Sequence, residues 1–123
     1  ELSVEYSKER IQWEKPIGEY QLIQLKLANM EVARFNIQNM LFNYLERKAK
    51  GKPMSFAEAS AMKLYSTQSA VEVASEAIQL FGGNGYMAEY KVEQLYRDAR
   101  VMRIYAGTDE MQIRAIARDL LSR

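Results

Sequence analysis

The residues best suited to chemistry in this chain gather in one short stretch, Gln79 to Gln112. Gly82-Gly83 and Asn84-Gly85 allow positive φ and a close approach of the backbone to another surface. A second break, Gly107-Thr108, places a good helix-capping residue directly before two acidic residues. A helix start of this kind leaves backbone amides free to receive an anion, a carbonyl oxygen or a ring nitrogen.

The same residues also have a purely structural interpretation. Glycine and threonine are common at helix ends in proteins that bind nothing there, so both breaks could be simple helix boundaries. The charged residues Arg97, Asp98, Arg100 and Arg103 are interpreted as structural ion pairs that fix a turn. We do not nominate Asp98, the one carboxylate among them, as a catalytic base.

Composition narrows the classes of function. The chain has 123 residues, enough for one domain, and a formal net charge of +1 without any basic block, so nothing indicates nucleic-acid binding. Histidine and cysteine are absent, which excludes disulfides, thiolate or imidazole catalysis and the usual zinc sites. We expect no metal site and no membrane span, because no apolar run is long enough to cross a bilayer and no signal sequence is recognisable. Two cellular compartments, the bacterial cytoplasm and the mitochondrial matrix, are both compatible with the sequence.

These chemical residues must be positioned by helices. Helical periodicity predicts helices over residues 1–13, 19–50, 55–81, 87–97 and 109–121. The first is expected to be the end of a helix that begins upstream, and Pro16 and Gly18 are expected to break it. Long helices joined by short breaks predict an all-α fold, an antiparallel up-and-down four-helix bundle with an additional short helix.

Two further patterns concern the helices themselves. Ser55 and Glu58 form a predicted capping box. Helix 19–50 has two adjacent apolar rows, which predict burial on more than one side. One row is Leu22, Leu25, Ala28, Val32, Phe35 and Phe42, and the other is Ile23, Leu27, Met30, Ile37, Leu41 and Tyr44. The inward face of the last helix is predicted to hold Met111, Ile116 and Leu120.

Four motifs together resemble one known family. They read RIQWEKPI at residues 10–17, QLFGGNGY at 79–86, EYKVEQLYRDAR at 89–100 and IYAGTDEMQ at 104–112. They are similar to RxxFGxPI, QxFGGxGY, EYxVEQLYRDAR and IYxGTxEMQ of the acyl-CoA dehydrogenase C-terminal domain. The resemblance implies that residues 1–123 are a fragment of a larger FAD-dependent enzyme that oxidises an acyl-CoA thioester to its trans-2-enoyl form.

The catalytic base is the clearest departure from that family. In many relatives a glutamate at the third position of IYxGT removes the α-proton, and here this position is Ala106, which cannot accept a proton. The chain resembles instead the isovaleryl and long-chain branch, whose glutamate lies on the helix before RxxFGxPI. The resemblance therefore implies that no residue of this chain is the base and that the chain alone is inactive.

The resemblance also implies which residues meet the cofactor and the substrate. The flavin contacts that it predicts are Arg10, Gln21, Gln79, Leu80, Phe81, Gly82, Gly83, Thr108, Asp109 and Glu110. Ala106 and Gly107 are expected beside the bound thioester. Some of these residues also have a purely structural interpretation: a surface salt bridge for Arg10, an ordinary exposed position for Gln21 and a capping role for the Thr108 segment. Glu14 replaces the usual glycine of RxxFGxPI and would place a carboxylate near an anionic cofactor, while Trp13 replaces the usual phenylalanine.

Partners and competing functions also follow from the resemblance. It implies an electron-transferring flavoprotein as acceptor and a homotetramer, a dimer of dimers, that shares flavin sites across subunits. One alternative is another flavoenzyme on the same scaffold, such as an acyl-CoA oxidase, a nitroalkane oxidase-like enzyme or a flavin monooxygenase. A non-catalytic helical interaction domain is the other. The FGG and GTDE elements argue against it, because a plain scaffold needs neither.

Overall fold

The structure, a computed structural model, describes all residues 1–123 and confirms the all-α prediction. Five α-helices alternate with short 3₁₀ segments and one small hairpin. In chain order the elements are α1 (Leu2–Glu9), β1 (Ile11–Gln12), β2 (Lys15–Pro16), η1 (Ile17–Glu19), α2 (Gln21–Ala49), α3 (Phe56–Phe81), η2 (Gly82–Tyr86), η3 (Ala88–Tyr90), α4 (Val92–Val101) and α5 (Asp109–Leu121).

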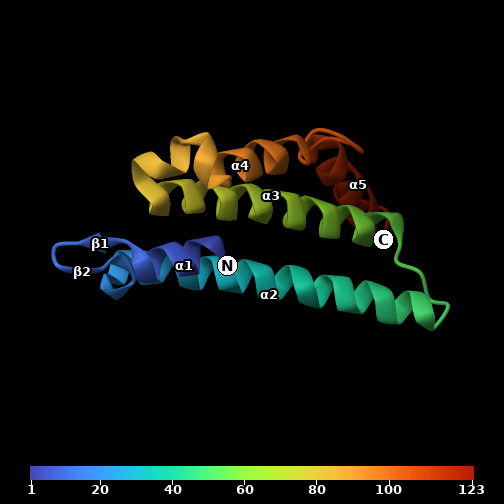
Figure 1. Cartoon of the computed structure of the whole chain (residues 1–123). Helices are drawn as coiled ribbons and strands as arrows, with labels where there is room; N and C mark the ends of the chain where they lie inside the picture. The colour runs from blue at the N-terminus through green and yellow to red at the C-terminus, as the bar shows by residue number, and fades with distance from the viewer.

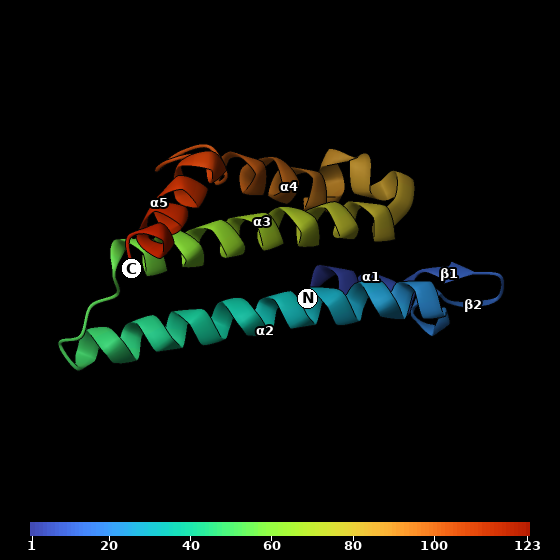
Figure 2. The same ribbon diagram turned by 180° about the vertical axis from the view of Figure 1, so that it is seen from behind.

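Helix α3 is the central element of the bundle (Figure 1). Helix α2 runs antiparallel along one side of it, and α1 lies beside the first part of α2. Helices α4 and α5 cover the opposite side of α3, and Figure 2 shows the same layers from behind. None of the helices combines the length and the apolar character needed to span a bilayer.

The first predicted helix is shorter than expected. Helix α1 ends at Glu9, and the chain then forms a two-stranded antiparallel hairpin in which Ile11 pairs with Pro16. The two residues at its tip, Trp13 and Glu14, have φ values of 52° and 65°. A two-residue loop with positive φ at both positions matches the twist of the strands, so the chain reverses before Pro16. The prediction of a helix to residue 13 was therefore wrong.

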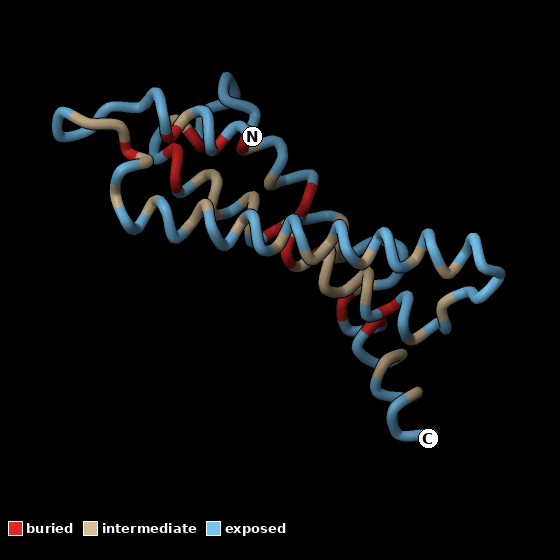
Figure 3. Tube along the Cα trace, turned by 90° about the horizontal axis from the view of Figure 1, so that it is seen from below, coloured by how far each residue is buried: buried red, intermediate tan, exposed pale blue.

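Helix α2 is covered on one side only within this chain (Figure 3). The row that contains Ile23, Leu27 and Met30 is half-buried against the rest of the bundle. The other row is open, with Leu22 75% exposed and Phe35 56% exposed. No residue of α2 is fully buried, so the predicted burial on more than one side is not met by this chain's own helices.

The remaining boundaries are set by caps and turns. The Ser55 hydroxyl accepts a hydrogen bond from the Glu58 backbone N–H at 3.1 Å and the Glu58 carboxylate accepts one from the Ser55 N–H at 2.7 Å, which confirms the capping box. Helix α4 begins at Val92 and extends to Val101, later than the predicted 87–97. The reason is that residues 82–90 form 3₁₀ turns and Lys91 has φ of 60°.

Helix α5 begins at Asp109 as predicted, but its inward face was predicted wrongly. Met111 and Leu120 are both more than half exposed, and Ile116 is half-buried. The buried residues of α5 are polar, Asp109 and Gln112. The face that packs on α3 is therefore the one that carries hydrogen-bonding groups.

Candidate functional site

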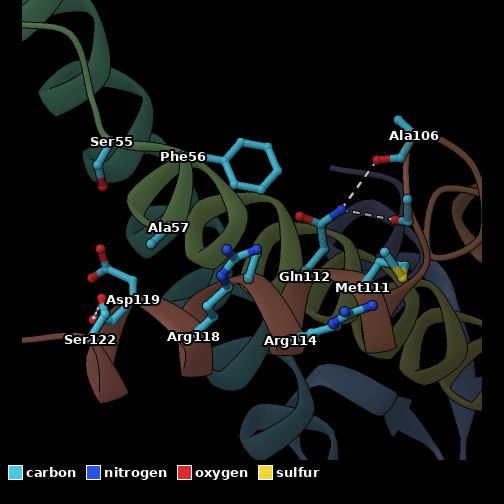
Figure 4. A pocket seen from close by; sticks show the side chains of 12 residues that line it. Ser55, Phe56, Ala57, Ala106, Met111, Gln112, Arg114, Arg118, Asp119 and Ser122 are labelled. Atoms are coloured by element: carbon cyan, nitrogen blue, oxygen red, sulfur yellow. Dashed lines mark hydrogen bonds between the residues drawn. The ribbon is translucent and has the colours of Figure 1, made fainter.

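The turn between α4 and α5 is held in an unusual backbone conformation. Ala106 has φ of 53° and Gly107 has φ of 90°. Their carbonyl oxygens both accept hydrogen bonds from Gln112 Nε2, at 3.2 Å and 3.0 Å, as Figure 4 shows. The Gly107 oxygen accepts a second bond, at 2.9 Å, from Lys63 Nζ on α3. Two helices therefore hold one peptide of the turn.

The other side of this turn consists of free donors. The backbone N–H groups of Ala106, Gly107 and Thr108 donate to no acceptor in the chain. Consecutive amides near positive-φ residues form a concave donor group that suits an anion or a carbonyl oxygen. The predicted free amides are thus present, and the turn itself supplies them, since the Asp109 N–H donates to the Arg103 carbonyl oxygen at 3.2 Å.

Asp109 is tied into the protein rather than presented to a ligand. Its Oδ2 accepts hydrogen bonds from Arg103 Nε at 2.7 Å and from Gln68 Nε2 at 3.1 Å. Burial raises the pKa of Asp109, but these hydrogen bonds more than offset the effect and the pKa lies below its usual value. A buried, ion-paired carboxylate with a lowered pKa is a poor proton acceptor. Its other oxygen, Oδ1, is buried without a partner.

Thr108 occupies the N-cap position of α5, but its side chain makes no capping hydrogen bond. Thr108 instead lowers the pKa of Glu110 below its usual value, and the Glu110 backbone N–H adds to this effect. Glu110 is exposed. The alternative that the Thr108 side chain caps α5 is therefore not supported.

The predicted ion-pair cluster around Arg103 is only partly present. Arg103 pairs with Asp109, as described, and Arg97 pairs with Glu93 at 3.6 Å within α4. Asp98 and Arg100 form no ion pair. The turn is thus fixed by Arg103 alone among the four residues.

A cavity of about 670 Å³ adjoins the Ala106–Gly107 turn, between the start of α3 and one face of α5 (Figure 4). Phe56 and Met111 give it apolar walls, and Arg114 and Arg118 add two guanidinium groups. Neither arginine forms an ion pair or a side-chain hydrogen bond in the chain. Neither arginine is among the residues predicted from the sequence, although two arginines four residues apart on one helix face were a visible signal.

The predicted glycine-rich break at Gly82–Gly85 lies at the C-terminal end of α3. We call it the second corner, the first corner being the turn at residues 106–108. Gly82 has φ of 61°, and a Cβ added at Gly82 or Gly83 would meet no atom of the chain within 4 Å. At Gly85, by contrast, a Cβ would lie 2.4 Å from the Ile78 carbonyl oxygen. Packing within the chain thus requires glycine at residue 85 but not at residue 83. Leu80 is buried in the core, as is Phe81, while Gln79 is exposed, so flavin contacts by the buried pair would involve their backbone.

Arg10 and Gln21 lie near this second corner, at the hairpin and at the first turn of α2. Arg10 is exposed and forms no ion pair, so the surface salt-bridge alternative is not supported. Glu14 does not neutralise it, because Glu14 also forms no ion pair. Gln21 lines a cavity of about 650 Å³ together with Leu80 and Trp13. The motif regions 10–17 and 79–86 therefore lie beside each other, with Gln21 next to both.

The two corners are well separated. Lys63 contacts Gly107 and Gln68 contacts Asp109, and Gln79 begins the second corner eleven to sixteen residues later on the same helix, which is about 16 to 24 Å at 1.5 Å per residue. One group of predicted residues, Arg10, Gln21 and Gln79 to Gly83, lies at one end of α3. The other group, Ala106 to Glu110, lies toward the opposite end.

Comparison with known proteins identifies the kind of domain. The family model described as "Acyl-CoA dehydrogenase, C-terminal domain" matches residues 1–121. The 3-(aryl)acrylate reductase of Clostridium sporogenes is 41% identical over 119 residues, which are 97% of this chain and 31% of that protein. The chain spans about a third of the length of the curated relatives it matches.

Solved structures show the same arrangement of helices. Butyryl-CoA dehydrogenase from Megasphaera elsdenii matches with a TM-score of 0.91 and 38% identity, over 98% of this chain and 31% of that chain. A structure described as the electron transferring flavoprotein of Acidaminococcus fermentans matches with a TM-score of 0.92 and 33% identity, over 99% of this chain and 32% of that chain.

Proposed function

The chain belongs to the acyl-CoA dehydrogenase family, and from that premise we propose that it is the C-terminal domain of an FAD-dependent enzyme that oxidises an acyl-CoA thioester to the trans-2-enoyl form. One observation carries the proposal. The N–H groups of Ala106, Gly107 and Thr108 are free and lie within the IYAGT segment, which the family places beside flavin and thioester. A thioester carbonyl that gains negative charge as its α-proton leaves needs such fixed donors.

The residues of this chain fit an FAD molecule. Arg10 is an unpaired guanidinium, which suits a pyrophosphate, and the backbone at Gly83 is open to close approach because a side chain there would meet nothing of the chain itself. When bound, the flavin supplies the acceptor for the hydride that leaves the β-carbon. Gln21, Gln79 and Gly82 complete the contacts proposed at this corner, and Thr108 and Glu110 those at the other.

The substrate contacts of this chain bind and orient without proton transfer. Ala106 and Gly107 would donate backbone hydrogen bonds to the thioester carbonyl, and Arg114 and Arg118 offer unpaired positive charge to the phosphates of coenzyme A in the adjoining cavity. No carboxylate is available as base there. Asp109 is ion-paired and Asp119 pairs with Arg123 at 2.7 Å. We propose that a glutamate outside residues 1–123 removes the α-proton.

The separation of the two corners supports a shared site. Groups about 16 to 24 Å apart along one helix cannot both hold one isoalloxazine ring. We propose that each corner contacts a different flavin in a homo-oligomer, a tetramer of paired dimers, so that Arg10 reaches the flavin of a neighbouring subunit. The open apolar row of α2, which includes Leu22, Val32 and Phe35, is a suitable contact surface for such an assembly. An electron-transferring flavoprotein is the proposed electron acceptor.

A second candidate is reduction of an acrylate-type double bond by a flavoenzyme on the same scaffold. The observation that favours it is the 41% identity to a 3-(aryl)acrylate reductase. The reaction is the reverse transfer of hydride to the β-carbon and of a proton to the α-carbon. The same backbone donors at Ala106 and Gly107 would serve it.

The test uses the longer protein that contains this domain. It is purified with its flavin, and a series of acyl-CoA thioesters is added under anaerobic conditions while the flavin absorbance is followed. Bleaching with one class of thioester supports the dehydrogenase. Reoxidation of pre-reduced flavin by arylacrylates, without bleaching by saturated thioesters, supports the reductase. A colourless protein that binds no FAD refutes both.

A matched pair of variants tests the proposed flavin contact. Arg10→Met is expected to weaken FAD binding roughly ten-fold or more, because it removes a charge-assisted hydrogen bond. Lys8→Met, which removes an exposed cation two residues away on α1, is the control and is expected to bind FAD like the unmodified protein. Equal affinities in the two variants would refute the role of Arg10.

A further inference from the structure

Lys63, which lies outside all four family motifs, contacts the turn between α4 and α5. It lies on α3, far from the turn in sequence, and its ammonium donates to the Gly107 carbonyl at 2.9 Å. It is also close enough to Asp109 to lower the pKa of that carboxyl. A half-buried lysine that reaches across to a backbone carbonyl forgoes much of the side-chain freedom that a solvated lysine keeps.

The geometry of a trans peptide gives this contact a consequence. The C=O of Gly107 and the N–H of Thr108 belong to one planar peptide and point in opposite directions. Holding the oxygen toward α3 and α5 therefore holds the Thr108 N–H away from them. That N–H has no acceptor in the chain. The hydrogen bonds from Lys63 and Gln112 to the turn, which we call the clamp, thus determine where the Thr108 N–H points.

Charge adds a second effect. The Gly107 oxygen accepts from a neutral amide, Gln112 Nε2 at 3.0 Å, and from a cation, Lys63 Nζ. Hydrogen bonds in a chain polarise one another, so a cation on the oxygen strengthens the N–H of the same peptide as a donor. Gln112 alone could fix the orientation, but only Lys63 supplies this charge.

We infer that Lys63 is a positioning residue of the flavin site, because its ammonium aims and polarises the Gly107–Thr108 peptide so that the Thr108 N–H donates to an acceptor atom of the bound flavin. The inference rests on the proposed function. Lys63 itself touches neither flavin nor substrate. Because Asp109 is neutralised by Arg103, the ammonium leaves a net positive charge behind the turn, on the side opposite the free amide.

The test compares three variants of the longer flavoprotein. Lys63→Met removes the ammonium and keeps a long, unbranched side chain, and Lys63→Arg keeps a charged donor. Lys52→Met removes a lysine of the α2–α3 connection whose side chain makes no contact of this kind. FAD affinity is measured by fluorescence titration of the apoprotein, and thioester affinity from the flavin absorbance shift with a non-reactive thioester analogue. Melting temperatures are recorded for each variant.

We expect roughly ten-fold weaker FAD binding in Lys63→Met, the effect of losing one charge-assisted hydrogen bond, with affinity within about three-fold of the unmodified protein in Lys63→Arg and Lys52→Met. Unchanged FAD affinity in Lys63→Met, or an equal loss in Lys52→Met, would overturn the inference. A loss confined to the thioester analogue would also overturn it, since the donor would then serve the substrate. If Lys63→Met lowers the melting temperature, Lys63→Arg decides, and a loss of FAD affinity without rescue counts against the inference. An unmodified protein that binds no FAD refutes the proposed function instead.

Discussion

Replacing Gly107 by alanine should destabilise the chain through two separable effects. At φ of 90° an L-residue is strained by about 1 to 2 kcal/mol. The new Cβ would lie 2.7 Å from Gln112 Nε2 and would displace that amide from the Ala106 and Gly107 carbonyls. Each lost neutral hydrogen bond costs about 1 kcal/mol. After a small gain from the less flexible unfolded chain, we expect a net loss of about 3 kcal/mol.

Urea unfolding of the 123-residue chain, followed by far-UV circular dichroism, measures this loss. Gly83→Ala is the matched control, because a Cβ there meets nothing within 4 Å, and it should change the free energy of unfolding by less than about 0.5 kcal/mol. In a Gln112→Ala background, Gly107→Ala should cost about 1 to 2 kcal/mol less than in the unmodified chain, since the same bonds cannot be lost twice. Additive losses, or a cost of Gly107→Ala below about 1 kcal/mol, would show that the clamp does not shape this turn.

Three other substitutions are predicted from the same structure. Glu14→Gly should raise the free energy of unfolding by about 1 kcal/mol, because Glu14 has φ of 65° at the hairpin tip, and a lower melting temperature would contradict this. Arg103→Met should cost about 2 kcal/mol in urea unfolding, because it leaves the buried Asp109 carboxylate short of a donor, and a cost no larger than that of the exposed-pair variant Arg97→Met would refute the account. In acid, Glu58 should matter, since hydrogen bonds from Arg47 and the Ser55 backbone lower its pKa to about 2. A depressed carboxyl pKa contributes stability above its unfolded value near 4.5 that is lost as the pH falls toward 2, so Glu58→Gln should show a shallower loss of stability across that window.

Helix ends marked by a side chain with a local partner were predictable from the sequence. The Ser55 capping box lies where the sequence places it, because this cap depends on residues only three positions apart. The start of α5 at Asp109 also lies where the sequence places it, although the Thr108 side chain makes no capping hydrogen bond there. The hairpin at residues 11–16 was not predictable in this way. Its tip is Trp13-Glu14 rather than the usual Asn-Gly, so the local signal for a two-residue turn is missing.

The face of α5 was mispredicted for a different reason. Apolar periodicity assumes that the buried side of a helix is its apolar side. Here the packing of α5 on α3 is decided by the turn before it, whose carbonyls and buried carboxylate need polar partners, and Gln112 is buried to supply one. Met111 is left to line the neighbouring cavity. Hydrogen bonding and apolar packing therefore compete for the same helix face, and periodicity alone does not distinguish them.

The sequence lists candidate site residues but does not place them in space. The motifs name Gln79 to Gly83 and Thr108 to Glu110 together, yet the turn before α5 contacts α3 at Lys63 and Gln68, eleven or more residues before Gln79. A rigid α-helix of this length has no hinge that would bring its ends together, since each residue adds about 1.5 Å along the axis. If both corners bind flavin, each must therefore meet a different molecule, or a different part of one dinucleotide that other polypeptide holds across the gap. Two different flavin molecules require an assembly of several chains. The exposed apolar row of α2, which includes Leu22, Val32 and Phe35, provides a surface for such an assembly.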